Sequence, residues 1–155
     1  MKMTKVEASL EINKPVKEVF AYASDWKHWA EWREGVTDLK PTSVIEKGNN
    51  ARYAYKALVA GLKFPLETEI HYYRENLGWQ GIVNKGFPHK MQWLFENKAS
   101  KTIVTYIIEY SPPWFLIGPL LNFFILKPNW QHMVEKTLNN LKISMENTQE
   151  RNSSD

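Results

Sequence analysis

The stretch LKPNWQHMVEKTLNNLKISM, residues 126–145, decides the fold of this chain. Its large apolar residues recur every three or four positions, which places them on one stripe of an α-helix. They are Leu126, Trp130, Met133, Val134, Leu138, Leu141 and Met145. A helix of this kind gains most of its stability by burying the stripe against another element. The sequence thus predicts a long C-terminal helix that ends near Met145 and packs on a concave apolar surface.

The segments before this helix supply strands for such a surface. Apolar and polar residues alternate with the period of a half-buried β-strand in residues 5–12, 51–59, 62–72, 77–83, 89–96 and 102–110. Residues 36–46 are a weaker strand candidate, because Pro41 interrupts them. Both faces of 102–110 are partly apolar, so the inward face of the last strand stays open. Short turns between successive strands predict antiparallel neighbours.

Two short helices are expected between the first and second strands. Asn13-Lys14-Pro15 has the cap and early proline of a helix start, and an amphipathic pattern follows over residues 16–23. Ser24 and Asp25 can end that helix and cap a second one over residues 26–33. The predicted fold class is α+β. It is a curved seven-stranded antiparallel sheet wrapped around the C-terminal helix, with two short helices between strands 1 and 2.

Size and composition limit the functions that the chain can have. Its 155 residues predict a single domain, residues 1–146, and a disordered tail, residues 147–155, which has no large apolar residue. A net charge of +3 with scattered Lys and Arg gives no nucleic-acid-binding stripe, and the absence of Cys excludes disulfides and thiolate chemistry. The longest apolar run, Trp114–Leu126, is shorter than the roughly 20 residues of a membrane-spanning helix. The N-terminus has no signal core, so we expect a soluble, cytoplasmic protein.

Motifs for catalysis or metal binding are weak in this sequence. Ser24, Asp25 and His28 lie close together, but Ser-Asp at a helix junction is ordinary capping, and no Gly-x-Ser-x-Gly elbow occurs. The histidines are too dispersed for metal-ligand spacing. We therefore predict no catalytic residue, no metal site and no cofactor.

Aromatic residues on the inward phase of the strands are the strongest functional signal. The chain has seven Trp, seven Tyr and seven Phe, and rings in such number favour a cavity over an aliphatic core. Inward Tyr hydroxyls with Thr68 could orient a mostly apolar ligand. The predicted ligand-binding residues are Tyr53, Tyr55, Phe64, Thr68, Tyr72, Trp79, His89, Trp93, Phe95, Tyr106, Trp130 and Val134. This prediction requires that the rings stand back from the C-terminal helix and leave a void larger than a few waters.

The order of these elements and three local motifs resemble the START-like, or SRPBCC, superfamily, with its polyketide cyclase/dehydrase and lipid transport family. The motifs are INKPVKEVF (residues 12–20), DWKHWAEW (residues 25–32) and the closing helix (residues 130–145). The resemblance implies a helix-grip fold over about residues 4–146. It also implies an internal cavity for lipids, sterols, polyketides, quinones or other apolar molecules. Some members of the superfamily are polyketide cyclases or aromatases, and others only bind or carry a ligand.

Three functions follow from these observations. The favoured one is binding or transport of a hydrophobic small molecule or lipid between the sheet and the C-terminal helix. An alternative is a polyketide cyclase/dehydratase-like enzyme that uses the same cavity, with His89 as acid or base, or Glu109 if the last strand faces the other way. The third is docking on a membrane surface or a second subunit through Trp114–Leu126, which is too apolar for an ordinary surface connection.

Overall fold

The computed structural model describes residues 3–112 and 114–152, with the backbone alone for residues 114–117 and 148–152. The strands are β1 (Thr4–Ile12), β2 (Val36–Pro41), β3 (Arg52–Val59), β4 (Leu62–Arg74), β5 (Gly78–Lys85), β6 (His89–Lys98) and β7 (Lys101–Tyr110). The helices are α1 (Val16–Ala23), the 3₁₀ turn η1 (Trp26–His28), α2 (Trp29–Trp32), α3 (Trp114–Leu121), the π-helical turn η2 (Asn122–Leu126) and α4 (Lys127–Asn152).

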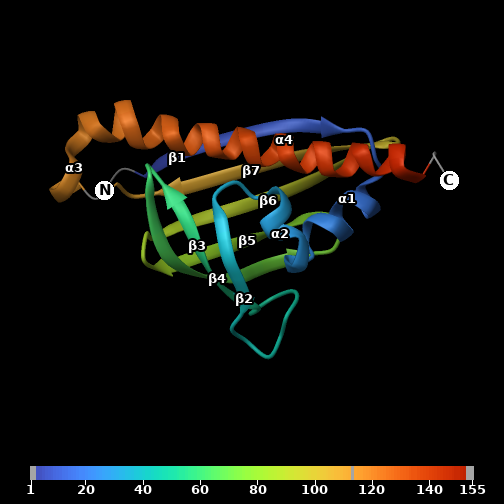
Figure 1. The fold of residues 1–155 in the computed structure, drawn as a ribbon, viewed down its shortest axis with the longest axis horizontal. Helices are drawn as coiled ribbons and strands as arrows, with labels where there is room; N and C mark the ends of the chain where they lie inside the picture. The colour runs from blue at the N-terminus through green and yellow to red at the C-terminus, as the bar shows by residue number, and fades with distance from the viewer. Residues whose placement is uncertain (1–2, 113, 153–155) are drawn as a thin grey trace.

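All strands belong to one antiparallel sheet in the order β1-β7-β6-β5-β4-β3-β2. The α4 helix runs along this sheet beside β1 and β7, with α1 and α2 next to its C-terminal half (Figure 1). The predicted α+β class, the seven antiparallel strands and the long closing helix are therefore confirmed.

Burial of one stripe holds α4 on the sheet. The predicted stripe residues Leu126, Trp130, Val134, Leu138, Leu141 and Met145 are buried. Met133 is partly buried, and His132, Lys136 and Asn139 on the other side are exposed. The helix continues past its predicted end near Met145 to Asn152, through residues expected from the sequence to be disordered, and residues 153–155 lie outside the described part.

The α1–α2 connection is built on the predicted cap. Asp25 accepts a hydrogen bond from the Lys27 backbone N–H at 3.1 Å and so caps η1. His28 Nδ1 lies 3.2 Å from a Glu31 carboxylate oxygen, and the ring stacks on Tyr22. His28 is thus engaged with Glu31 and Tyr22, and it makes no hydrogen bond to Ser24 among the described residues.

A bulge near the end of β4 reverses one predicted side chain. Tyr72 has a φ of +51°, and the pairing with β5 shifts between His71 and Arg74. An extra residue in the left-handed region turns the following side chains to the opposite face. Tyr72 is consequently 74% exposed, and the prediction that it faces the core is wrong. Tyr73 turns inward instead and packs against Phe20, with 5.6 Å between the ring centroids.

The even-numbered residues of β7 face inward. The sequence alone does not decide between the two faces of this strand. Val104, Tyr106, Ile108 and Tyr110 are each at most 2% exposed. Glu109 lies on the opposite face of the sheet, where its neighbours on the adjacent strands are Lys5 and Lys90. Glu109 therefore cannot serve as an acid or base in a cavity beneath α4.

The segment between β7 and α4 is bent and apolar. Gly118 has a φ of +63° and Pro119 follows it, which breaks α3 into two parts. Asn122 anchors the segment, since it accepts a hydrogen bond from the Tyr110 hydroxyl at 2.9 Å and donates to Thr4 at 3.2 Å. Within the described residues, no helix is both long enough and apolar enough to cross a bilayer.

The stripe predicts where substitutions in α4 are costly. We expect Leu138→Ala to lower the free energy of unfolding by about 2–5 kcal/mol, because Leu138 is 1% exposed and its removal leaves a cavity. Ile143→Ala on the same helix, where the side chain is 56% exposed, should change it by less than about 0.5 kcal/mol. Urea unfolding at neutral pH measures both. Equal losses for the two variants would contradict the buried stripe.

Candidate ligand-binding site

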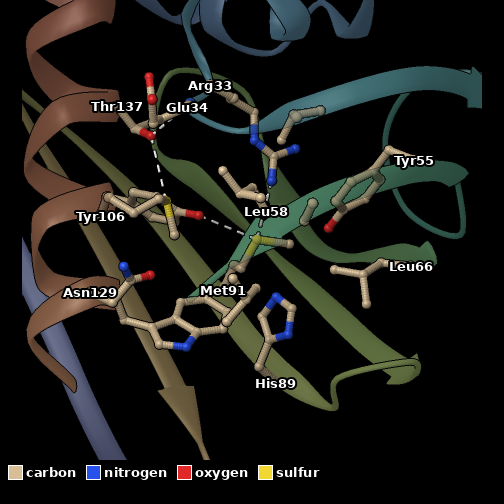
Figure 2. Close-up of a pocket in the computed structure, with 15 residues that line it drawn as sticks. Arg33, Glu34, Tyr55, Leu58, Leu66, His89, Met91, Tyr106, Asn129 and Thr137 are labelled. Carbon is tan, nitrogen blue, oxygen red and sulfur yellow. Dashed lines mark hydrogen bonds between the residues drawn. The ribbon is translucent and has the colours of Figure 1, made fainter. Parts of the chain in front are cut away.

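A small pocket lies beneath the N-terminal half of α4, between that helix, the inner face of the sheet and the connection from α2 to β2 (Figure 2). The sheet contributes Tyr55, Leu66, His89, Met91 and Tyr106. The helix contributes Asn129, Trp130, Met133 and Thr137. Arg33 and Glu34 close the pocket from the α2–β2 connection. The site thus draws on elements far apart in the sequence.

The pocket is much smaller than the predicted cavity. The space open to the centre of a water-sized molecule is about 30 Å³. One water needs a cavity of roughly 10–15 Å³, so the pocket has room for two or three waters. With the solvent at its mouth, the pocket holds about 460 Å³ not occupied by protein atoms. The expected void larger than a few waters is not present here, and the prediction of rings standing back from the helix is wrong for this structure.

Interlocking of the aromatic side chains explains the small volume. Trp93 stacks on Tyr106 at 3.8 Å between ring centroids and on Trp79 at 5.8 Å, because the three residues are opposite one another on adjacent strands. Trp130 of α4 stacks on Tyr110 at 5.4 Å and meets His89 edge-on at 5.0 Å. Most of the ring area that the sequence assigns to a cavity is therefore used to fill the core.

The predicted ligand-binding residues divide among several places. Those that line the pocket are Tyr55, His89, Tyr106 and Trp130. Those buried in the core without lining it are Thr68, Trp93, Phe95 and Val134. Tyr53 and Trp79 border a second pocket of about 10 Å³ beside Trp29. Phe64 is partly buried against Phe87, at 6.1 Å between centroids. Tyr72 borders an open groove of about 240 Å³ on the outer face.

The sequence prediction omits Arg33, Met91 and Met133 from the site. Met91 and Met133 have the inward strand phase and the helix stripe that could have included them. Arg33 has no such signal, because a charged residue at the end of a short helix is ordinarily solvated. Its position follows from Trp32, which is 1% exposed and holds the end of α2 in the core.

Arg33 is the most unusual residue of the pocket. It is 8% exposed, and its guanidinium lies 5.1 Å from the ring centre of Trp29 and 5.3 Å from that of Tyr55. Nη2 donates to the sulfur of Met91 at 3.3 Å (Figure 2). Among the described residues, none places a carboxylate oxygen within 4.0 Å of the guanidinium. The cation is therefore buried without a counter-ion from the described protein.

Further donors around Arg33 lack good acceptors. The Tyr106 hydroxyl also donates to the Met91 sulfur, at 3.4 Å, and burial raises the pKa of Tyr106 to about 12. The Tyr55 hydroxyl and the Trp130 indole N–H are buried and have no hydrogen-bond partner among the described residues. A thioether is a weak acceptor. The pocket is thus rich in hydrogen-bond donors and poor in acceptors.

His89 is held neutral at the base of the pocket. Its Nδ1 lies 2.6 Å from the Phe87 carbonyl oxygen, which can only accept, so the proton is on Nδ1 and Nε2 carries a lone pair. Burial lowers the pKa of His89 to about 4, and the charge of Arg33 acts in the same direction, whereas the hydrogen bond to Phe87 opposes them. A base with this pKa accepts a proton poorly near neutral pH.

A family model matches almost the whole chain. The model described as polyketide cyclase / dehydrase and lipid transport matches residues 3–146. No curated protein matches the chain.

Solved structures share the fold at low sequence identity. TTHA0849 from Thermus thermophilus is 22% identical, with a TM-score of 0.78, over 94% of this chain and 99% of that one. A START superfamily protein from Mycobacterium smegmatis is 14% identical, with a TM-score of 0.77, over 93% and 98%. StfQ, a di-domain ARO/CYC from the steffimycin biosynthetic pathway, is 13% identical, with a TM-score of 0.68, over 94% of this chain and 52% of that one.

Burial of neutral His89 predicts a loss of stability in mild acid. The unfolded histidine titrates near pH 6.5 and the folded one near 4, so its contribution is complete above pH 6.5 and is lost as the pH falls toward 4. At pH 5 we expect the free energy of unfolding to be lower than at pH 7 by about 2 kcal/mol because of His89.

Urea unfolding of the wild type and His89→Gln at pH 7 and pH 5 measures this effect. Glutamine keeps a donor for the Phe87 carbonyl but does not titrate, so its loss on acidification should be smaller by about 2 kcal/mol. Carboxylates titrate in both proteins, so their contribution to the change in the free energy of unfolding cancels in the comparison. Identical losses in the two proteins would contradict a buried neutral His89.

Proposed function

Because the chain belongs to the polyketide cyclase / dehydrase and lipid transport family, we propose that it binds an apolar small molecule in the pocket beneath α4. One observation carries this proposal. Buried donor residues from three separate elements, Arg33, Tyr106 and Trp130, line a mostly apolar space, and their donors meet no good acceptor from the described protein. A few polar groups in an apolar pocket are typical of small-molecule sites, where they fix the orientation of the ligand.

The pocket must widen to admit a ligand, and its walls favour this. Met91 and Met133 line it, and methionine side chains are unbranched and readily change rotamer. Backbone N–H groups at the mouth donate hydrogen bonds to side chains of α4. They run from the Ala60 N–H to Asn129 and from the Glu34 N–H to Thr137, both at 3.1 Å. Breaking the bond of Ala60 would let the β3–β4 turn move away from α4, whereas the α2–β2 connection is also held by the contacts of Glu34 with Lys136 and Asn140.

An enzyme of the cyclase or dehydratase type is the second candidate, because His89 lies in the pocket with a free lone pair on Nε2. Its pKa of about 4 makes it a poor base near neutral pH. Glu34 also lines the pocket, but its carboxylate pairs with Lys136 at 3.2 Å. Binding without catalysis is the simpler function for these residues.

Docking on a membrane surface would give such a protein access to an apolar ligand. Figure 1 shows α3 at one end of the molecule. Large apolar side chains at the end of α3 and in η2 are between 45% and 72% exposed. They are Leu120, Leu121, Phe123, Phe124 and Ile125, and we name them the η2 patch. Residues 110–134 contain no Asp or Glu, so the patch carries no charge that an anionic membrane would repel. The patch ends a few residues before Asn129 and Trp130, which line the pocket.

A neutral aromatic probe tests binding in the pocket. We expect 2-naphthamide to bind the wild type, as measured by calorimetry and by quenching of tryptophan fluorescence. Ala57 lines the pocket, so Ala57→Phe should fill the mouth and weaken binding by about tenfold or more, which corresponds to about 1.4 kcal/mol.

Ala54→Phe on the same strand is the matched control, because Ala54 has the opposite phase and should leave binding unchanged. Equal affinities of the two variants would place the site elsewhere. Absence of probe binding, together with ligand-free native mass spectra from repeated preparations, would overturn the proposed function.

Membrane docking is tested by co-sedimentation with phosphatidylcholine vesicles that contain phosphatidylglycerol. Phe123→Ser and Phe124→Ser should each weaken binding by about tenfold or more, because each removes a large apolar side chain from the interface. Leu77→Ser, at a 57% exposed site in the β4–β5 turn, should have no effect. Unchanged sedimentation of the Phe variants would contradict docking. A dimer in solution that these variants dissociate would assign the η2 patch to a second copy of the chain instead.

A further inference from the structure

The contacts of Arg33 within the described protein do not offset the free-energy cost of burying its charge. A buried guanidinium is unfavourable unless a counter-ion and acceptors replace water. In the described residues, its hydrogen-bonding neighbours are the thioether of Met91 and the hydroxyl of Tyr106, and neither carries a negative charge. The two rings around it, Trp29 and Tyr55, attract a cation but offer no charged oxygen. Among the described residues, the acceptors that meet this side chain are therefore weak or uncharged.

The acidic residue nearest in sequence does not neutralise Arg33. Glu34 turns its carboxylate toward α4, where one oxygen lies 3.2 Å from Lys136 Nζ and the other 3.4 Å from Asn140 Nδ2. Figure 2 shows Glu34 beside Thr137 while the Arg33 guanidinium points the other way, toward Met91. The pocket therefore keeps a positive charge at its centre, since His89 is neutral.

Arg33 and a second donor, Tyr106, both bind the sulfur of Met91. The Tyr106 hydroxyl approaches the Met91 sulfur from β7 at 3.4 Å, and the guanidinium approaches it from the α2–β2 connection at 3.3 Å. Figure 2 shows both donors aimed at this sulfur, which lies inside the pocket. The buried Tyr55 hydroxyl, which also lines the pocket, has no partner in the described protein. The methionine sulfur thus occupies the position where an oxygen acceptor would be far better bonded.

We propose that this position is a subsite for the carboxylate of an apolar organic acid, with Arg33 as its counter-ion and Tyr106 as a hydrogen-bond donor. The inference rests on the proposed function and adds the chemical class of the ligand. A guanidinium presents parallel N–H donors that match the two oxygens of a carboxylate, and such charge-assisted bonds are roughly twice as strong as neutral ones. Rotation of Met91 away from the two donors opens the subsite, and the apolar body of the acid lies toward Leu66 and Met133.

A matched ligand pair separates the carboxylate subsite from general apolar binding. 2-Naphthoate and 2-naphthamide have nearly the same shape and differ in charge. By calorimetry at pH 7, the wild type should bind naphthoate about tenfold or more tightly than naphthamide. Arg33→Gln should remove this preference and leave the affinity for naphthamide within about threefold.

Lys127→Gln is the control for net charge, because it removes one positive charge at an exposed position of α4 near the pocket and leaves the Glu34–Lys136 ion pair intact. It should keep the preference for naphthoate. Equal binding of the two compounds to the wild type, or a preference that survives Arg33→Gln, would overturn the carboxylate subsite while the proposed function stands. If neither compound binds the wild type, the proposed function fails and the subsite with it.

Thermal unfolding tests the subsite without depending on probe shape. Without ligand, Arg33→Met should raise the Tm, because it replaces an uncompensated buried cation with an apolar side chain of similar length. A lowered Tm for Arg33→Met would show that Arg33 serves the stability of the fold, and it would overturn the assignment.

Discussion

Burial of one apolar stripe of α4 against the sheet is the constraint on which the rest of the structure depends. The C-terminal part of the stripe, with Leu138 and Leu141, is at most 1% exposed against the elements around it. The N-terminal part, around Trp130 and Met133, meets the sheet where the pocket lies. The same helix therefore secures the fold with one half and forms the wall of the candidate site with the other. The proposed ligand site therefore lies beside the N-terminal half of α4 and away from Leu138 and Leu141.

The periodicity of the sequence is sufficient to predict this architecture. Alternation in the strands and three- or four-residue spacing in α4 both report which side chains are buried, and burial of those side chains is what forms the sheet–helix layers. The reversal at Tyr72 could not be predicted in this way. It depends on a single residue in the left-handed region, and the bulge is favoured by pairing with β5 and by the fit of Tyr73 against Phe20.

The candidate site is less predictable from sequence, for two physical reasons. Whether aromatic rings fill a core or line a void depends on how they pack against one another. Trp93 and Tyr106 stack at 3.8 Å between ring centroids because β6 and β7 pair in this register, which the sequence pattern of either strand does not show. The burial of Arg33 depends on how the end of α2 is held by Trp32, which no local pattern around Arg33 reports. The phase of Tyr55, His89, Tyr106 and Trp130 predicts that they face the interior, but Trp93 and Phe95 share this phase and do not line the pocket.

The balance of polar groups in the pocket argues for recognition over proton transfer. Catalysis by a general acid or base needs a group whose pKa lies near the working pH, and His89, with a pKa of about 4, does not meet this condition. Recognition needs donors that are fixed by their surroundings and that meet only a weak acceptor within the protein. Arg33, held between Trp29 and Tyr55, and Tyr106, held by its stack on Trp93, meet that condition. Rigid rings thus orient both donors, and the flexible Met91 between them is the side chain that the proposed ligand would displace.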